Sequence, residues 1–269
     1  MNAPGFHWRE VDGVRVLVPD FFDALGLCGG YSTRARTTGE SLDLDYRGGK
    51  DANAVRHARR AVAAATGVRA ERIVLGQQVH GARVAVVSEA DAGRGGLSAD
   101  DVLDGADALV TAAEGVALMG LAADCAIVLM ADEGRRAVAM AHSGREGTAQ
   151  NVAAAAVEAL GGLGAAPGAL YAAIGPAIGV CCYDVGEEAM RKFGGSFRWA
   201  DEVFTIVSGR AHLDLPKAIG RQLIEAGVRR ERVFDAGLCT SCHNDLFFSY
   251  RREREKAGRF AGVISIGKG

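Results

Sequence analysis

The sequence lacks an excess of charge of either sign. It holds 31 Lys and Arg residues against 33 Asp and Glu residues, a formal net charge of −2. So balanced a composition gives no overall electrostatic attraction for a polyanion. We therefore expect no nucleic-acid partner, and any anion site must be local.

Long uninterrupted hydrophobic runs are also missing. The apolar run from Val116 to Ala131 is broken by Asp124 and is too short to span a bilayer. The first ten residues, M-N-A-P-G-F-H-W-R-E, lack the basic start and apolar core typical of a secretory signal. We expect a cytoplasmic protein that has no membrane partner.

The six cysteines do not resemble a disulfide framework, because they are spread over 269 residues. We expect Cys181 and Cys182 to be packing residues, since a disulfide between sequence neighbours is strained. Cys239-x-x-Cys242-His243 formally fits a c-type haem attachment site, which needs export, or a metal site that lacks a second cysteine pair. We favour structural thiols there.

Strand-like and helix-like segments alternate along the chain. This alternation predicts an α/β (α+β) fold, a single compact domain over residues 1–269 with a mixed β-sheet core flanked by helices. The predicted strands are 73–75, 83–87, 108–110, 116–122, 127–131, 136–141, 172–174 and a last one that ends at Ile266. The predicted helices are 53–66 with Asn53 as N-cap, 149–160 ended by Gly161, and one that starts after Asp214 and ends at Gly227.

Three residue types that bind metals lie where apolar runs meet Gly or Asp: His80, Cys125 and His142. Two imidazoles and one thiolate leave a fourth position of a tetrahedral ion open, and such an ion is catalytic. The competing interpretation is a buried core cysteine and two hydrogen-bonded histidines, because the three residues lack a compact zinc spacing.

A glycine-containing loop over residues 142–148 joins a predicted strand to a predicted helix. Backbone N–H groups at such a helix start favour phosphate or another anion. The loop lacks the lysine of a nucleotide-binding P-loop, so ATP is not implied.

Later in the chain, aromatic rings lie beside arginines in the segment Phe247-Phe248-Ser249-Tyr250-Arg251-Arg252. Such a group can stack a base and hold an anion, or cover a core edge.

An ordered series of motifs covers nearly the whole chain. The motifs are Ser32-Thr33-Arg34, Ser41-Leu42-Asp43-Leu44, Gln78-Val79-His80-Gly81, Ala108-Leu109-Val110-Thr111, Ala123-Asp124-Cys125, the His142 glycine loop, Ile174-Gly175-Pro176, Cys182-Tyr183-Asp184-Val185-Gly186 and Phe247 to Arg252. In this order they resemble the laccase-domain, or polyphenol-oxidase, family.

The resemblance implies a metal, usually zinc and sometimes described as copper, held by His80, Cys125 and His142. It implies a purine nucleoside phosphorylase that acts on adenosine, inosine, guanosine or methylthioadenosine with phosphate and also deaminates adenosine. The candidate catalytic residues are Asp124 and Cys125. Asp124 would orient a ligand or transfer protons, although a turn role fits it equally well. The candidate substrate contacts are Arg34, Gly144, Arg145, Tyr250 and Arg251.

Two other functions stay open. A polyphenol oxidase needs several coppers and many histidines, whereas this chain has six histidines, of which two are in metal motifs. The other function is peptidoglycan editing on cell-wall precursors.

The glycine-containing loop over residues 142–148 departs from the family pattern H-A-G-W-R-G: Arg145 stands at the tryptophan position and Glu146 at the arginine position. Phosphate binding through that arginine is therefore in question, and the sequence does not define the preferred nucleoside or the oligomeric state.

Overall fold

The computed structural model describes residues 3–267 and confirms a mixed α/β fold, with three β-sheets. The first sheet has the order β1 (Phe6–Val11), β2 (Val14–Pro19), β3 (Leu27–Ser32), β15 (Phe260–Ile266), β7 (Ala117–Ala122) and β4 (Ile73–Leu75). The second has the order β14 (Val233–Asp235), β10 (Leu170–Ile174), β8 (Ala126–Asp132), β9 (Val138–Ser143), β6 (Ala108–Thr111) and β5 (Val84–Val87). The small third sheet contains β11 (Asp184–Val185), β13 (Arg210–Leu213) and β12 (Phe204–Val207).

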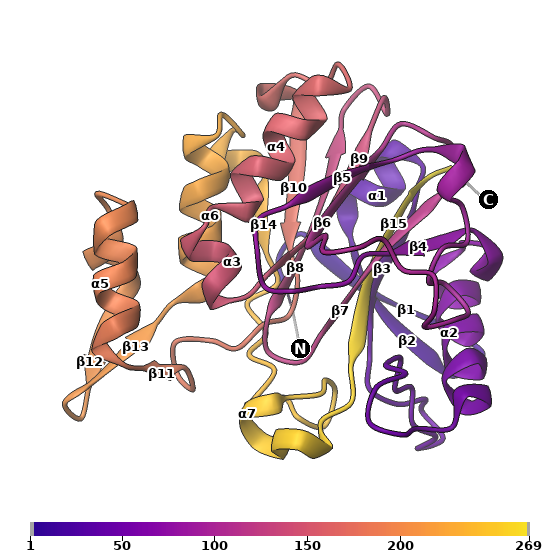
Figure 1. Cartoon of the computed structure of the whole chain (residues 1–269), viewed down its shortest axis with the longest axis horizontal. Coiled ribbons are helices and arrows are strands. Elements are labelled where there is room, and N and C mark those ends of the chain that lie inside the picture. The colour runs from indigo at the N-terminus through magenta and orange to yellow at the C-terminus, as the bar shows by residue number, and fades with distance from the viewer. Residues whose placement is uncertain (1–2, 268–269) are drawn as a thin grey trace.

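Helices lie on both sides of the two large sheets (Figure 1). The helices are α1 (Asp20–Leu25), α2 (Ala52–Thr66), α3 (Arg145–Ala149), α4 (Val152–Gly162), α5 (Glu187–Ser196), α6 (Leu215–Glu225) and α7 (Tyr250–Glu253). Helices α4 and α6 lie on one side and α2 on the other, while α5 and the third sheet project at the edge. No helix within residues 3–267 is long and apolar enough to cross a membrane.

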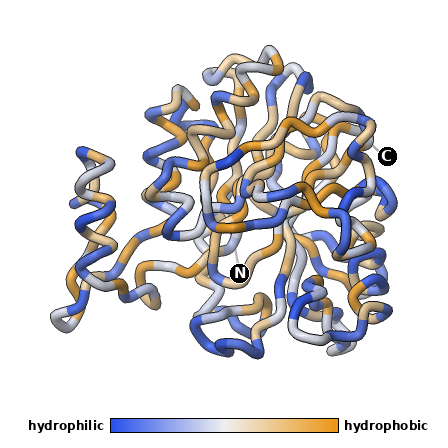
Figure 2. The backbone as a smooth tube through the Cα atoms, in the orientation of Figure 1, coloured by the Kyte–Doolittle hydropathy of each residue, from blue (hydrophilic) through white to orange (hydrophobic). Residues whose placement is uncertain are grey.

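The central strands are buried on both faces, which explains their continuous apolar sequence. In β8, Ile127 and Leu129 belong to the core between the two large sheets, whereas Val128 and Met130 face the core under α4 and α6. Figure 2 shows the same pattern, with hydrophobic residues gathered along the inner strands. The second sheet therefore lies between the two cores.

Most predicted elements are confirmed, but several boundaries were wrong. Asp51, not Asn53, caps α2, because its side chain accepts the Asn53 N–H at 2.9 Å. The helix predicted over 149–160 is two helices, α3 and α4, separated at Asn151 with φ 65°. Strand β9 continues through His142 and Ser143, so the predicted loop is reduced to Gly144. Helix α6 ends at Glu225, two residues before Gly227.

Tyr31 joins the two large sheets. Its ring is fully buried, and its hydroxyl donates to the Ala173 carbonyl of β10 at 2.7 Å. Gly175, just after β10, lies against this ring. A Cβ added there would lie 2.2 Å from the Tyr31 Cε1 atom.

We expect Gly175→Ala to destabilise the fold by about 3 kcal/mol, because the new methyl group overpacks the core against the buried Tyr31 ring. Chemical denaturation with circular dichroism measures this change. Gly168→Ala is the matched control, since nothing lies within 4 Å of a Cβ at that glycine. Equal stability of the two variants would contradict the proposed role of Gly175.

Candidate metal centre and its pocket

His80, Cys125 and His142 meet at one rim of the second sheet. Cys125 immediately precedes β8, His142 lies near the end of β9, and His80 lies in the turn before β5. Their ligand atoms all lie within 4.8 Å of one another. The two imidazole rings meet edge to face, with centroids 5.0 Å apart. The structure thus brings together the three residues that the sequence placed far apart.

The turn that holds His80 is organised around the Asp107 carboxylate. The N–H groups of Val79, His80 and Gly81 donate to it at 3.1, 3.0 and 2.7 Å. His80 has φ 63°, a left-handed conformation that is unfavourable for a residue with a side chain. Three hydrogen bonds to one carboxylate offset that cost and fix the direction of the His80 side chain.

The same carboxylate orients His142. Asp107 is fully buried, and its Oδ1 lies 2.8 Å from His142 Nδ1. Register explains the contact: β6 pairs with β9 so that Ala108 faces Ala141, and the His142 N–H donates to the Asp107 carbonyl at 2.8 Å. Burial opposes ionisation of Asp107, but the hydrogen bonds from His142 and Gly81 lower its pKa overall. A carboxylate behind a histidine ligand fixes the tautomer and orientation of its ring.

Cys125 and His142 form a charge pair. Burial alone would raise the pKa of Cys125, but the His142 charge and hydrogen bonds from His142 and His80 lower it to about 6. Burial alone would lower the pKa of His142, but the Cys125 thiolate and Asp107 raise it to about 9. The site therefore stabilises a thiolate, the form of cysteine that binds metals.

The donor set and the free space both fit a metal ion. Two imidazoles and a thiolate are soft enough for zinc or copper and leave a fourth position open. Gly144 supplies the space, because a Cβ at this position would lie 2.7 Å from Cys125 Sγ and 3.3 Å from His80 Cδ2. A larger residue would fill the volume next to the sulfur.

The pKa values predict how the metal-stripped protein responds to pH. The depressed Cys125 pKa gives a stabilisation that is present at higher pH and is lost as the pH falls through about 6. The raised His142 pKa gives one that is present at lower pH and is lost as the pH rises through about 9. Between these values we expect a reactive Cys125 thiolate.

Alkylation of each thiol, followed by peptide mass spectrometry, measures this directly. We expect the rate at Cys125 to reach half its maximum near pH 6. Cys242 is the internal control, because its hydrogen bond with Cys182 raises its pKa and delays alkylation to higher pH. A midpoint above pH 8 at Cys125 would contradict the charge pair.

A cavity of about 470 Å³ opens beside the three residues. This volume is within the range of small-molecule sites. Five arginines line it (Arg47, Arg145, Arg251, Arg254 and Arg259), against two carboxylates, Asp124 and Glu146. Arg47, Arg145 and Arg251 pair with Asp45, Glu146 and Asp184. The remaining positive charge, from Arg254 and Arg259, suits an anionic ligand.

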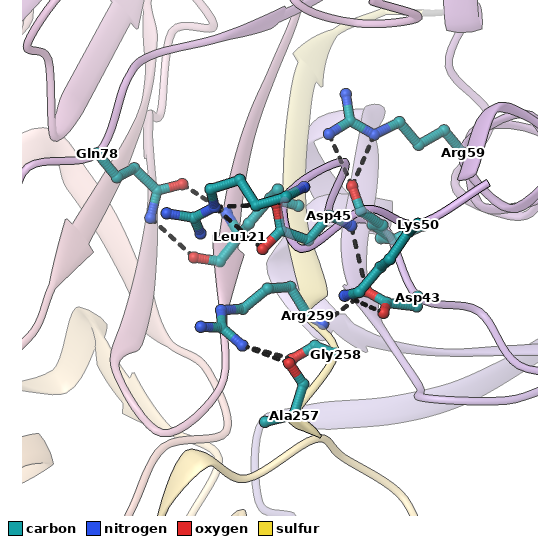
Figure 3. Close-up of polar contacts among 11 residues, drawn as sticks. Asp43, Asp45, Lys50, Arg59, Gln78, Leu121, Ala257, Gly258 and Arg259 are labelled. Carbon is teal, nitrogen blue, oxygen red and sulfur yellow. Dashed lines mark hydrogen bonds and ion pairs between the residues drawn. The ribbon is translucent and has the colours of Figure 1, made fainter. Parts of the chain in front are cut away.

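Backbone contacts fix the side of the cavity shown in Figure 3. The Gln78 amide donates to the Leu121 carbonyl at 2.7 Å and accepts the Leu121 N–H at 2.8 Å, which ties the His80 turn to β7. The Arg259 N–H donates to Asp43 at 3.0 Å, and its guanidinium donates to the carbonyls of Ala257 and Gly258 at 2.8 and 2.9 Å. The pocket wall is therefore held in place without a ligand.

Asp124 lines the cavity, but both of its carboxylate oxygens already accept hydrogen bonds. The Thr240 hydroxyl donates to one oxygen at 2.6 Å, and the Arg251 N–H donates to the other at 2.6 Å. Its carbonyl accepts the Ile178 N–H at 2.8 Å. These contacts tie three distant segments together, so the geometry favours a positioning role over proton transfer.

The predicted substrate contacts separate into two groups. Arg145, Tyr250 and Arg251 line the cavity, and Gly144 lies against the metal candidates. Arg34 is not among the lining residues: its guanidinium donates to Asn244 and Glu253 at 2.7 and 2.8 Å and stacks over Phe248. The structure thus gives Arg34 a packing role.

Sequence reasoning missed several residues of this site. Asp107 was not singled out, although an acidic residue directly before a buried strand could have drawn notice. Tyr183 also lines the cavity, and burial raises its pKa to about 12. Arg47 and Arg254 belong to none of the sequence motifs described above. The fold, not a local motif, places both arginines at the cavity.

The chain is similar to known proteins over nearly its whole length. A family model described as multi-copper polyphenol oxidoreductase laccase matches residues 27–267. The chain is 32% identical to purine nucleoside phosphorylase YlmD of Geobacillus stearothermophilus over 97% of both chains. The crystal structure of that YlmD superposes with a TM-score of 0.89 and 32% identity, covering 98% of this chain and 99% of the other.

Further relatives show the same likeness. Purine nucleoside phosphorylase SCO2081 of Streptomyces coelicolor is 40% identical over 84% of this chain and 88% of its own. Adenosine deaminase RL5, from an unknown prokaryotic organism, is 34% identical over 80% of this chain and 83% of its own. These matches span most of each sequence. The chain belongs to the multi-copper polyphenol oxidoreductase laccase family.

Proposed function

We propose that this protein is a metal-dependent purine nucleoside phosphorylase that also deaminates adenosine. The observation that carries the proposal is the convergence of His80, Cys125 and His142 beside an arginine-lined cavity of about 470 Å³. Relatives named purine nucleoside phosphorylase and adenosine deaminase support the same substrate class. The substrates in this proposal are adenosine, inosine, guanosine and methylthioadenosine, with phosphate, in the cytoplasm.

His80, Cys125 and His142 would hold the metal, for which we propose zinc because the reaction needs no change of oxidation state. When bound, such an ion polarises an oxygen atom or lowers the pKa of a water molecule. The donor groups of the described residues also argue against a multi-copper oxidase. Residues 3–267 contain two clusters with metal-binding potential, and neither has more than two histidines.

The arginines on the wall would bind phosphate and hold it against the ribose C1′ of the nucleoside. Placing the two reactants together removes much of the entropic cost of the reaction, and the positive charge stabilises the developing negative charge. The Tyr183 hydroxyl keeps its proton near neutral pH, since its pKa is about 12, and can donate a hydrogen bond to the substrate. In this proposal the Tyr183 and Tyr250 rings flank the base.

The test incubates metal-quantified protein with adenosine, inosine, guanosine and methylthioadenosine, with and without phosphate. We expect free base to appear only with phosphate, and inosine to form from adenosine without it. Cys125→Ala should lose both activities, whereas Cys28→Ala, in the core of the first sheet, should keep them. Unchanged activity in Cys125→Ala would remove the proposal.

Parallel assays with phenols and with muropeptide precursors separate the alternative functions. Stoichiometric copper and oxygen consumption with phenols would indicate a polyphenol oxidase. Silence with every nucleoside, combined with turnover of muropeptide precursors, would indicate a role in peptidoglycan editing. Either result would replace the nucleoside phosphorylase.

Glu146 partly neutralises the positive charge at the cavity. Its carboxylate accepts from Arg145 Nε at 2.9 Å and also pairs with Lys192. Pairing with two cations reduces the repulsion that an unpaired Glu146 carboxylate would exert on phosphate. It also occupies the Arg145 guanidinium.

We therefore expect Glu146→Gln to lower the KM for phosphate by about 2- to 5-fold, because Arg145 is released and a partly exposed ion pair is weak. Phosphate-dependent initial rates measure this. Glu187→Gln, which breaks an exposed pair with Arg191 on α5, is the control and should change nothing. A raised KM for phosphate in Glu146→Gln would show that the Arg145–Glu146 pair itself positions the anion.

A further inference from the structure

Four cysteines meet away from the metal centre described above. Cys181 and Cys182 follow β10, whereas Cys239 and Cys242 follow β14. Strands β10 and β14 are parallel neighbours, so the chain leaves both at the same edge of the sheet. A bridge between Ala177 and Cys239 extends this pairing. The fold thus supplies the second cysteine pair that the Cys239-x-x-Cys242 motif lacked.

The sulfur positions suit a tetrahedral ion. All four Sγ atoms lie within 4.8 Å of one another, and Cys242 Sγ is 3.5 Å from the Sγ atoms of both Cys181 and Cys182. A zinc ion with Zn–S bonds of about 2.3 Å holds its sulfurs about 3.8 Å apart. The two separations of 3.5 Å are close to this value, and the limit of 4.8 Å for all four atoms allows it. They are much longer than the S–S bond of about 2.05 Å in a disulfide.

The backbone also contacts the sulfur cluster directly. The Gly179 N–H donates to Cys239 Sγ at 3.3 Å, a contact that stabilises negative charge on sulfur. Gly179 also passes close to the cluster, because a Cβ there would lie 3.2 Å from Cys239 Cβ and 3.4 Å from Cys181 Sγ. Cys181 and Cys242 are exposed. The prediction that Cys181 is a packing residue was therefore wrong, whereas Cys182 does pack against the second core.

We propose that Cys181, Cys182, Cys239 and Cys242 bind one structural zinc ion. Four thiolates leave no open coordination position, so this ion has no catalytic role. Its effect is to join two irregular segments, residues 175–183 and 236–249, which otherwise meet through few backbone hydrogen bonds.

The first joined segment lines the catalytic cavity, and the second holds in place residues that line or flank it. Tyr183 follows Cys182 directly and lines the cavity. Thr240 lies between Cys239 and Cys242 and donates to Asp124 at 2.6 Å. Arg252 Nε donates to the Ser241 carbonyl at 3.0 Å, which links α7 to the same turn. The zinc ion would therefore stabilise this wall from outside the cavity.

Metal analysis of protein purified under reducing conditions without chelator tests the proposal. We expect two zinc ions per chain in the wild type, one in Cys125→Ala and one in the Cys239→Ser/Cys242→Ser double variant. Cys28→Ala is the matched thiol control and should keep both. The zinc content of Cys125→Ala does not depend on nucleoside turnover. It therefore tests the four-cysteine site even if the proposed function is wrong.

Cobalt substitution gives a second measurement that does not require a cysteine variant of the cluster to fold. Cys125→Ala stripped of zinc and titrated with Co²⁺ should bind one equivalent, with the intense thiolate-to-cobalt charge-transfer bands of four sulfur ligands. Its thermal unfolding midpoint should rise on zinc addition. A Cys125→Ala protein that binds neither ion, or wild-type protein whose four cysteines are paired as disulfides even after purification under reducing conditions, would overturn the proposal.

Discussion

Asp107→Asn is expected to lower the affinity of the His80, Cys125 and His142 site for zinc by about 10- to 100-fold, and kcat/KM should fall with it. Substitutions of residues that orient metal ligands have effects of this size. The Asp107 carboxylate accepts three N–H groups of the His80 turn and also contacts His142 Nδ1. An amide of the same shape has one acceptor oxygen, so one side of this network must lose its partner.

Zinc competition with a chromophoric chelator measures the affinity, with the four-cysteine cluster removed by the Cys239→Ser/Cys242→Ser background. Asp132→Asn is the matched control. Asp132 is equally buried but lies at the opposite end of β8 and pairs with Arg136. Equal zinc affinity in Asp107→Asn and Asp132→Asn would show that Asp107 serves only the fold.

Gly144→Ala is expected to reduce kcat/KM by about 100-fold while the protein stays folded. Gly144 has φ −85° and ψ −176°, a conformation that alanine adopts without strain. Its new methyl group would lie 2.7 Å from Cys125 Sγ and 3.3 Å from His80 Cδ2, so both ligands must shift. Misplacement of catalytic groups by about 1 Å has a cost of this order.

Gly186→Ala provides the comparison for Gly144→Ala. Gly186 is also the N-cap residue of a helix, and nothing lies within 4 Å of a Cβ at that position. Steady-state kinetics together with zinc content distinguish the two variants. If Gly144→Ala keeps wild-type kcat/KM and zinc content, the free volume beside Cys125 has no part in metal binding.

The sequence predicted the central strands because they are continuous apolar runs, and burial on both faces of the second sheet requires such runs. It did not predict the break between α3 and α4, because Asn151 adopts a left-handed conformation inside an alanine-rich stretch that favours helix. Local preference and the observed backbone disagree at this position.

The sequence motifs predicted the candidate metal ligands, but they did not predict the residues that orient these ligands. Asp107 contacts His142 because of the register between β6 and β9, which the sequence of either strand does not specify. The four-cysteine cluster depends in the same way on the pairing of β10 with β14, which joins segments about sixty positions apart. Contacts that depend on the pairing of distant strands could therefore not be predicted from the sequence, even where the residue types suggested a function.

A single carboxylate serves both histidine-bearing segments, and this has a consequence for engineering. His80 and His142 cannot be re-aimed separately, because any shift of Asp107 toward one withdraws it from the other. A redesign for an ion of different size or geometry must therefore rebuild the turn before β5 and the end of β9 together. In a variant library that changes only one of these two segments, most proteins would therefore have one histidine that is no longer oriented by Asp107.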